Sequence, residues 1–235
     1  MTRSGARTSH RVAVGALLAT AAWQSASQAA PPAAAAVTDR AVIRFLAPEM
    51  GGVRAPRFIF ERELAFEARL EALSDPHHEP SADQPFLTRH VRSAMERHMA
   101  ETLLESLEVQ PPAREIDVQA GVEAARLALY QRVGGEQQLS RAAAAEGLDP
   151  SEVRRMLRRQ ARASIYLDRM VAPMFDPTDR ELRALLEAGR TPYTSRPFAK
   201  VREQLRRWYV GVRLGEAVVG FFESARSRLT VVILK

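Results

Sequence analysis

A long helical repeat of apolar residues near the C-terminal end constrains the fold more than any other feature of the sequence. Between residues 198 and 222 the following residues recur every three or four positions: Phe198, Val201, Leu205, Trp208, Val212, Gly215, Val219 and Phe222. That spacing matches one face of a helix with 3.6 residues per turn. It predicts a helix of up to about 45 Å, the longest element of the chain.

Further helices follow from the same periodicity and from start and stop signals. Asp149, Pro150 and Glu152 offer an N-cap acceptor, a proline at the first helical position and an acid at N3. Residues 176–179 repeat that start signal, and Pro173 ends the preceding helix. The predicted helices cover residues 58–73, 85–107, 118–133, 136–146, 150–171 and 177–189, with Pro85 at a first helical position.

Two short β-strands are predicted, one near each end of the helical region. Residues 40–46 form a short apolar run, and Leu229, Val231 and Ile233 alternate within a β-branched segment. An isolated strand pair is only marginally stable. The two strands are therefore expected to pair and to pack on helices, which gives a mainly α fold closed by its two ends.

The first residues resemble a secretory signal. Arg3, Arg7 and Arg11 precede an apolar stretch of about a dozen residues, which is shorter than the roughly 20 that a transmembrane helix needs. Small residues then favour cleavage after Ala29, with Ala36 as the alternative. We therefore expect a signal peptide at 1–29, a Pro/Ala linker at 30–37, a helical domain at 38–235 and export to the periplasm.

Composition excludes several kinds of site. The chain has no cysteine, which removes disulfides, thiolate zinc sites, cysteine nucleophiles and a lipid-modified cysteine. No phosphate-loop, dinucleotide, nucleophile-elbow or HExxH pattern occurs, and the histidines at 77, 78, 90 and 98 lack ligand spacing. The expectation is a protein without cofactor, metal or catalytic residues.

One feature favours a different function. Ala143, Gly147 and Val153 stand at the spacing of a helix-turn-helix, and an arginine-rich helix follows. If the leader is removed with its three arginines, 31 of the 34 basic residues remain, compared with 28 acidic residues. This small excess of positive charge does not require a nucleic-acid partner. A DNA-binding regulator therefore stays an alternative. We interpret the arginines as a solvated face, with transient contact to a membrane surface or acidic partners as the other option.

The order of elements resembles the core domain of SurA-like periplasmic chaperones over residues 39–235. The stretch 139–166, the helix start at 177–182 and the ending with Trp208, 224–226 and 229–234 carry the resemblance. It implies that an N-terminal strand and helices pack with a late helix and strand. It also implies binding of unfolded envelope or outer-membrane proteins.

The chain departs from that family in one respect. Members of that family carry a parvulin-type rotamase module. The only gap where one would insert here is the loop at 189–197, which is too short to hold it. Peptidyl-prolyl isomerase activity is therefore an alternative by family label only. The expected function is chaperone-like binding without catalysis.

Flexible methionines are the candidate peptide-binding residues. Thioether side chains adapt to varied apolar ligands, and Tyr166 lies one helical turn before Met170. The predicted groove residues are Met95, Met99, Tyr166, Met170 and Met174. Core packing is the alternative role for each of them.

Overall fold

The computed structural model describes residues 39–48, 53–81 and 84–234. The chain divides into two units, and the second is Thr38–Lys235. The described ranges cover this unit except for its two end residues and two short gaps. The predicted signal peptide at 1–29 and the linker at 30–37 lie outside the described residues. Both stay predictions.

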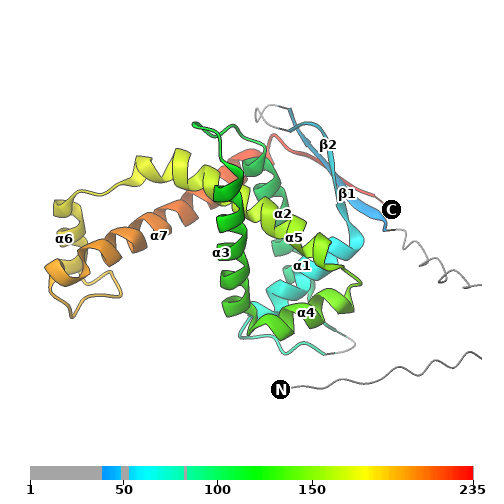
Figure 1. Ribbon diagram of the computed structural model, residues 1–235, viewed down its shortest axis with the longest axis horizontal. Helices are drawn as coiled ribbons and strands as arrows, with labels where there is room; N and C mark the ends of the chain where they lie inside the picture. Colours follow the sequence, from blue (N-terminus) through cyan, green and yellow to red (C-terminus); the bar gives the residue numbers. More distant parts are fainter. Residues whose placement is uncertain (1–38, 49–52, 82–83, 235) are drawn as a thin grey trace, which may run out of the picture. The chain divides into compact units, whose positions relative to one another are not determined.

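The described chain is mainly helical, as predicted, with a small sheet (Figure 1). Its elements are β1 (Ala41–Ala47), β2 (Val53–Phe60), α1 (Glu61–Ser74), α2 (Thr88–Glu105), α3 (Glu115–Val133), α4 (Glu136–Ala145), α5 (Pro150–Tyr166), the π-helical turn η2 (Leu167–Val171), the 3₁₀ turn η3 (Ala172–Phe175), α6 (Asp179–Glu187), α7 (Phe198–Arg226) and β3 (Thr230–Ile233).

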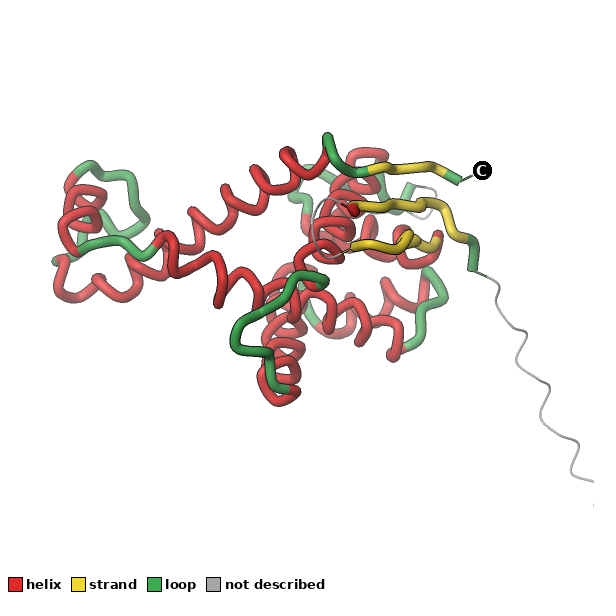
Figure 2. The backbone as a smooth tube through the Cα atoms, turned by 90° about the horizontal axis from the view of Figure 1, so that it is seen from above, coloured by secondary structure: helices red, strands yellow, loops and turns green. Residues whose placement is uncertain are grey.

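The predicted pairing of the two end strands is confirmed. The sheet has the order β2-β1-β3, and both pairs are antiparallel (Figure 2). Ile43 lies opposite Ile233, and Phe45 lies opposite Val231. The segment after residue 226 therefore closes the domain against β1.

Strand β2 was not predicted, because Gly51, Gly52 and Pro56 indicated a break and residues 58–60 were assigned to a helix. That assignment is wrong: residues 57–60 pair with β1, and α1 begins at Glu61. Proline lacks an N–H donor, so it is tolerated in a strand at the edge of a sheet. β2 is such an edge strand.

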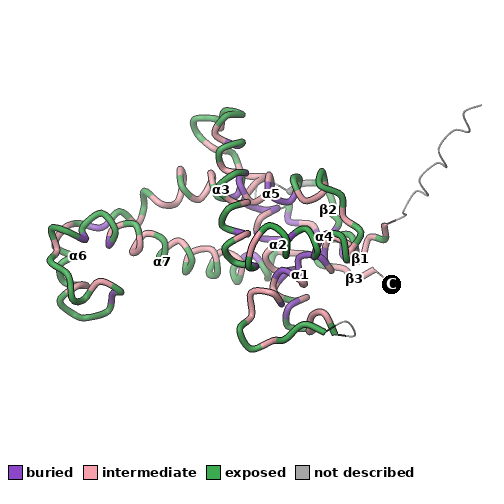
Figure 3. The backbone as a smooth tube through the Cα atoms, turned by 60° about the horizontal axis from the view of Figure 1, so that its bottom comes forward, coloured by how far each residue is buried: buried purple, intermediate pink, exposed green. Residues whose placement is uncertain are grey.

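The core consists of two main clusters. In Figure 3, many of the buried residues, in purple, lie where α1, α2, α3 and α5 meet. In the first, Phe66 and Leu70 of α1 pack with residues of α3, α4 and α5, including Met156. In the second, Phe45 and Ile59 bring the inner face of the sheet onto α1 and α2. The apolar periodicity of α1, α2 and α5 is thus explained by packing on one another and on the sheet.

The helix starts follow the predicted chemistry with local shifts. Asp149 caps α5: its Oδ1 accepts from the backbone N–H groups of Ser151 and Glu152, at 2.6 and 3.0 Å. For α6 the cap is Thr178 rather than Asp176, with Glu181 as its partner. α2 begins at Thr88 instead of Pro85, because the side chain of His90 caps the backbone N–H of Leu87.

The end of α5 also differs from the prediction. A regular helix was expected to about Val171, but α-helical geometry ends at Tyr166 and a π turn and a 3₁₀ turn follow. Pro173 has no N–H to continue the helical ladder. Between Tyr166 and α6, the side chains consequently no longer follow the α-helical spacing of α5.

The long predicted helix is confirmed as α7, but its apolar face is buried only near its ends. Val201 and Leu205 pack against α6 and the turns before it, and Ala225 is buried beside the sheet. Between them, Val212 and Val219 are 40% and 58% exposed. The first half of α7 and α6 lie apart from the sheet (Figure 2).

Replacing the α6 cap residue Thr178 with alanine is expected to weaken α6 by about 1 kcal/mol. Thr178 Oγ1 accepts from the Glu181 backbone N–H at 3.3 Å, and Glu181 Oε2 accepts from the Thr178 N–H at 2.8 Å. Amide hydrogen exchange in α6 should accelerate accordingly. Thr194→Ala, at an exposed loop position, serves as the control and should leave exchange in α6 unchanged.

Candidate functional site

An open apolar groove lies between α2, α5 and the C-terminal third of α7, residues 218–226. Its volume is about 530 Å³. The apolar walls are Ala100, Leu104, Ala163, Leu167, Val218, Val219 and Phe222, and the polar lining is Glu96, Arg97, Glu101, Gln160, Ser164, Glu223 and Arg226. The groove can thus take an apolar ligand and meet its polar flanks with charges of both signs.

Helical spacing explains why these residues meet. Ala100 and Leu104 are one turn apart on α2, and Ala163 and Leu167 are one turn apart across the end of α5. The two alanines take little space and leave the floor of the groove wide. Val219 and Phe222 belong to the apolar face of α7 that the sequence indicates, so their periodicity was visible although their place in a groove was not.

Met95 and Met99 do not line this groove. Met99 is buried in the cluster formed by the sheet, α1 and α2, and Met95 packs against the same cluster. Their spacing of four residues places them together on the side of α2 that meets the sheet. Their position corresponds to the alternative of core packing.

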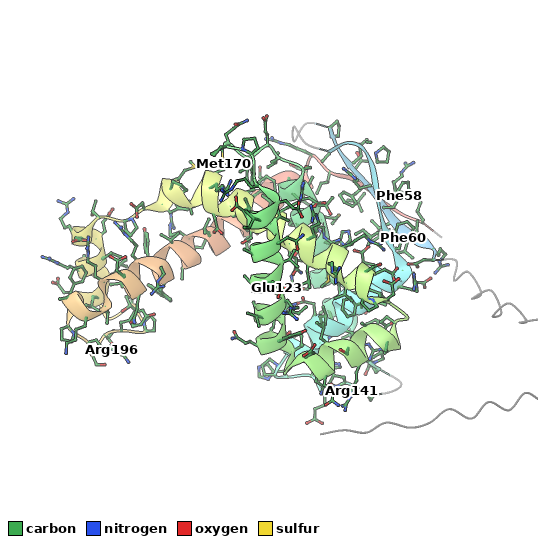
Figure 4. All side chains as sticks on the ribbon, in the orientation of Figure 1. Phe58, Phe60, Glu123, Arg141, Met170 and Arg196 are labelled. Atoms are coloured by element: carbon green, nitrogen blue, oxygen red, sulfur yellow. The ribbon has the colours of Figure 1, made fainter. Side chains whose placement is uncertain are left out.

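Tyr166, Met170 and Met174 also lie outside the groove lining. Tyr166 and Met170 are half-buried, and Met174 is 77% exposed; Figure 4 shows Met170 on the turn after α5. The prediction placed Tyr166 and Met170 one turn apart on a regular helix that runs to about Val171, with Met174 just beyond its end. The π and 3₁₀ turns change that period.

A second cavity, of about 460 Å³, lies between β2 and α5. Phe58 and Phe60 of β2 stand on its sheet side (Figure 4). The full lining is Phe45, Arg57, Phe58, Phe60, Glu63, His98, Thr102, Glu105, Arg155, Arg158, Arg159 and Arg162. In contrast to the groove, it is rich in arginine.

Arg159 is buried at the base of this cavity and binds three glutamates. Its Nη1 donates to Glu63 Oε1 at 2.7 Å and its Nε to Glu101 Oε2 at 3.2 Å, while Nη2 donates to Glu67. His98 Nδ1 lies 3.2 Å from Glu67 Oε1. The predicted solvated arginine face therefore contains a buried member that joins α5 to α1 and α2.

The carboxylates of this cluster differ in pKa because they have different partners. Burial raises the pKa of Glu67, but Arg159 and His98 together outweigh it and hold the pKa below its ordinary value. Burial raises the pKa of Glu101 to about 7, since Arg159 only partly offsets it and the charge of Glu67 adds to it. Burial next to the charge of Glu67 thus lets Glu101 hold a proton up to near-neutral pH.

The same cluster contains three potential metal ligands. Ligand atoms of Glu63, Glu67 and His98 lie within 4.8 Å of one another. The guanidinium of Arg159, however, hydrogen-bonds to both carboxylates. The arrangement is explained as an ion-pair network, and no metal is assigned to it.

The other histidines have local structural contacts. His90 Nδ1 accepts from the Leu87 N–H at 3.1 Å, and its Nε2 lies 3.0 Å from Asp75 Oδ2. The rings of His78 and His90 meet edge to face, with their centroids 4.8 Å apart. These contacts hold the loop before α2 against the start of that helix.

The helix-turn-helix spacing corresponds to α4, a turn and α5. Gly147 has a φ of +68°, which suits glycine in that turn, and Ala143 and Val153 face the first core cluster. Two arginines of the second helix are already bound: Arg158 to Glu115 at 2.7 Å and Arg159 to its three glutamates. Both pairings reduce what this helix offers to phosphates.

No protein-family model, curated protein or solved structure matches the chain in comparisons with known proteins. Among the described helices, none combines the length and apolar character required to cross a lipid bilayer.

Proposed function

We propose that this chain is an exported, chaperone-like protein that binds apolar segments of unfolded envelope or outer-membrane proteins in the groove between α2, α5 and α7. The observation that carries the proposal is the open groove with apolar walls and a charged rim. Burial of apolar surface in it needs no chemical step. The resemblance to SurA-like chaperones and the signal-like N-terminus favour the periplasm.

The groove suits varied ligands better than one specific ligand. Its walls are aliphatic and aromatic side chains without directional contacts, and α7 touches α2 only along a short stretch. A site of this kind is complementary to many apolar segments and closely complementary to none. We therefore expect affinities near the micromolar range, or roughly 8 kcal/mol.

Val219→Asp tests the groove directly. Val219 is 58% exposed, so an aspartate there can fold without a buried charge, yet it lines the groove. Binding of a fluorescent apolar, aromatic-containing peptide should weaken about tenfold, because desolvating the carboxylate opposes burial. The variant should also delay aggregation of a urea-unfolded outer-membrane protein less well than the wild-type chain.

Val212→Asp is the matched control. Val212 lies on the same helix, two turns earlier, is 40% exposed and is not part of the groove lining. It should bind the peptide like the wild-type chain. Equal losses in both variants, or no binding by the wild-type chain, would refute the groove as the client site.

A further inference from the structure

The arginine-rich cavity is a second site, with chemistry unlike that of the groove. One wall is the edge strand β2, through Arg57, Phe58 and Phe60. The opposite wall is α5, through the arginines at positions 155, 158, 159 and 162. The cavity thus has the edge of a strand on one side and a row of positively charged side chains on the other.

Three of these arginines have guanidinium groups available to a ligand. Arg57 and Arg162 form no ion pair with a carboxylate in the described ranges of the chain. Arg155 is 72% exposed and reaches Glu152 only at 3.7 Å. Arg158 and Arg159 are paired with glutamates. Glu105 also lines the cavity and has no ion pair among the described residues. The available charge in the cavity is thus positive.

The outer edge of β2 favours a polypeptide as the ligand of this cavity. β2 pairs with β1 on one side only, so its other edge presents backbone donors and acceptors without a strand partner in the described chain. Pro56 removes one donor, which leaves residues 57–60 as the usable edge. Phe58 and Phe60 are 44% and 40% exposed and lie on one face, as residues two apart do in a strand.

We propose that an extended, acidic polypeptide segment adds as a strand to the edge of β2 and places carboxylates at Arg57, Arg155 and Arg162. Backbone hydrogen bonds with β2 hold the segment, and its apolar side chains contact Phe58 and Phe60. Side chains two apart on the segment are about 7 Å apart on one face. Arg155 and Arg162 are about 10 Å apart along α5, a difference that flexible arginine side chains bridge. The site is independent of the apolar groove.

Direct binding tests the proposal with the full chain. The probe is a short fluorescent peptide in which glutamate and valine alternate, and fluorescence anisotropy measures its affinity. The Arg155→Glu/Arg162→Glu variant should bind it at least about tenfold more weakly than the wild-type chain. Binding by the wild-type chain should weaken with added salt.

The control has the same change in charge at another place. Arg141→Glu/Arg154→Glu alters two exposed arginines on α4 and α5 that do not line the cavity (Figure 4 labels Arg141). Its affinity should stay within about twofold of the wild-type value. Equal losses in both variants would show attraction by net charge alone and would refute the site.

Backbone methylation separates strand addition from simple anion binding. Two versions of the peptide carry N-methyl groups on alternate residues, one on each edge of the strand. Only the version methylated on the edge that meets β2 should lose binding, because only that edge donates to β2. If both versions bind equally, or if single-stranded DNA or phosphatidylglycerol vesicles lose affinity in the arginine variant while the peptide does not, the proposal is wrong.

Discussion

Arg159→Met is expected to lower the free energy of unfolding by about 3–5 kcal/mol. The guanidinium of Arg159 is the shared partner of Glu63, Glu67 and Glu101, which come from α1 and α2. Methionine fills a similar space but leaves three carboxylates close together without that cation. Urea unfolding at neutral pH, followed by circular dichroism, measures the loss.

Two comparisons identify the cause of that loss. Arg158→Met, on the same helix as Arg159, removes an exposed pair with Glu115 of α3 and should change stability much less. The loss in Arg159→Met should also shrink near pH 5, where the buried carboxylates of the variant can take up protons. A loss as large at pH 5 as at pH 8 would assign the effect to packing instead of charge.

Local signals were enough to predict most of the helical fold. The Asp149 cap, the glycine stop after residue 133 and the 3–4 spacing of α7 each depend on residues within a few turns of one another. β2 escaped prediction because its pairing with β1 compensates for Pro56, and that pairing is a tertiary contact. The π turn after Tyr166 likewise depends on how the chain turns toward α6, which apolar periodicity does not encode.

The candidate sites were harder to predict for a related reason. Methionine type alone pointed to residues 95, 99, 170 and 174, whereas the groove depends on which part of α7 stays uncovered by other elements. The periodic valines of α7 were visible in the sequence, but a helical face appears the same whether it is buried or open. The role of Arg159 required knowing that α1, α2 and α5 converge on it.

Glu101 is expected to make stability fall as pH rises from about 5 to about 8. Burial raises its pKa in the folded chain to about 7, above its ordinary value of 4.5. Between these two values the folded chain holds a proton that the unfolded chain has released, so stability decreases with rising pH. The contribution is complete below the unfolded pKa and is lost as pH passes the folded one. In full, its size is about 3 kcal/mol.

Glu101→Gln should remove this pH dependence, because glutamine resembles the protonated acid and does not titrate. The difference in unfolding free energy between variant and wild type should be small at pH 5 and should favour the variant by about 2–3 kcal/mol at pH 8. The low pKa of Glu67 acts in the opposite direction, but only on acidification below this window. Glu79→Gln, at an exposed loop position, should give a difference that does not vary with pH. A pH-independent difference for Glu101→Gln as well would show that Glu101 is ionised in the folded chain throughout this pH range, and would contradict the raised pKa of Glu101.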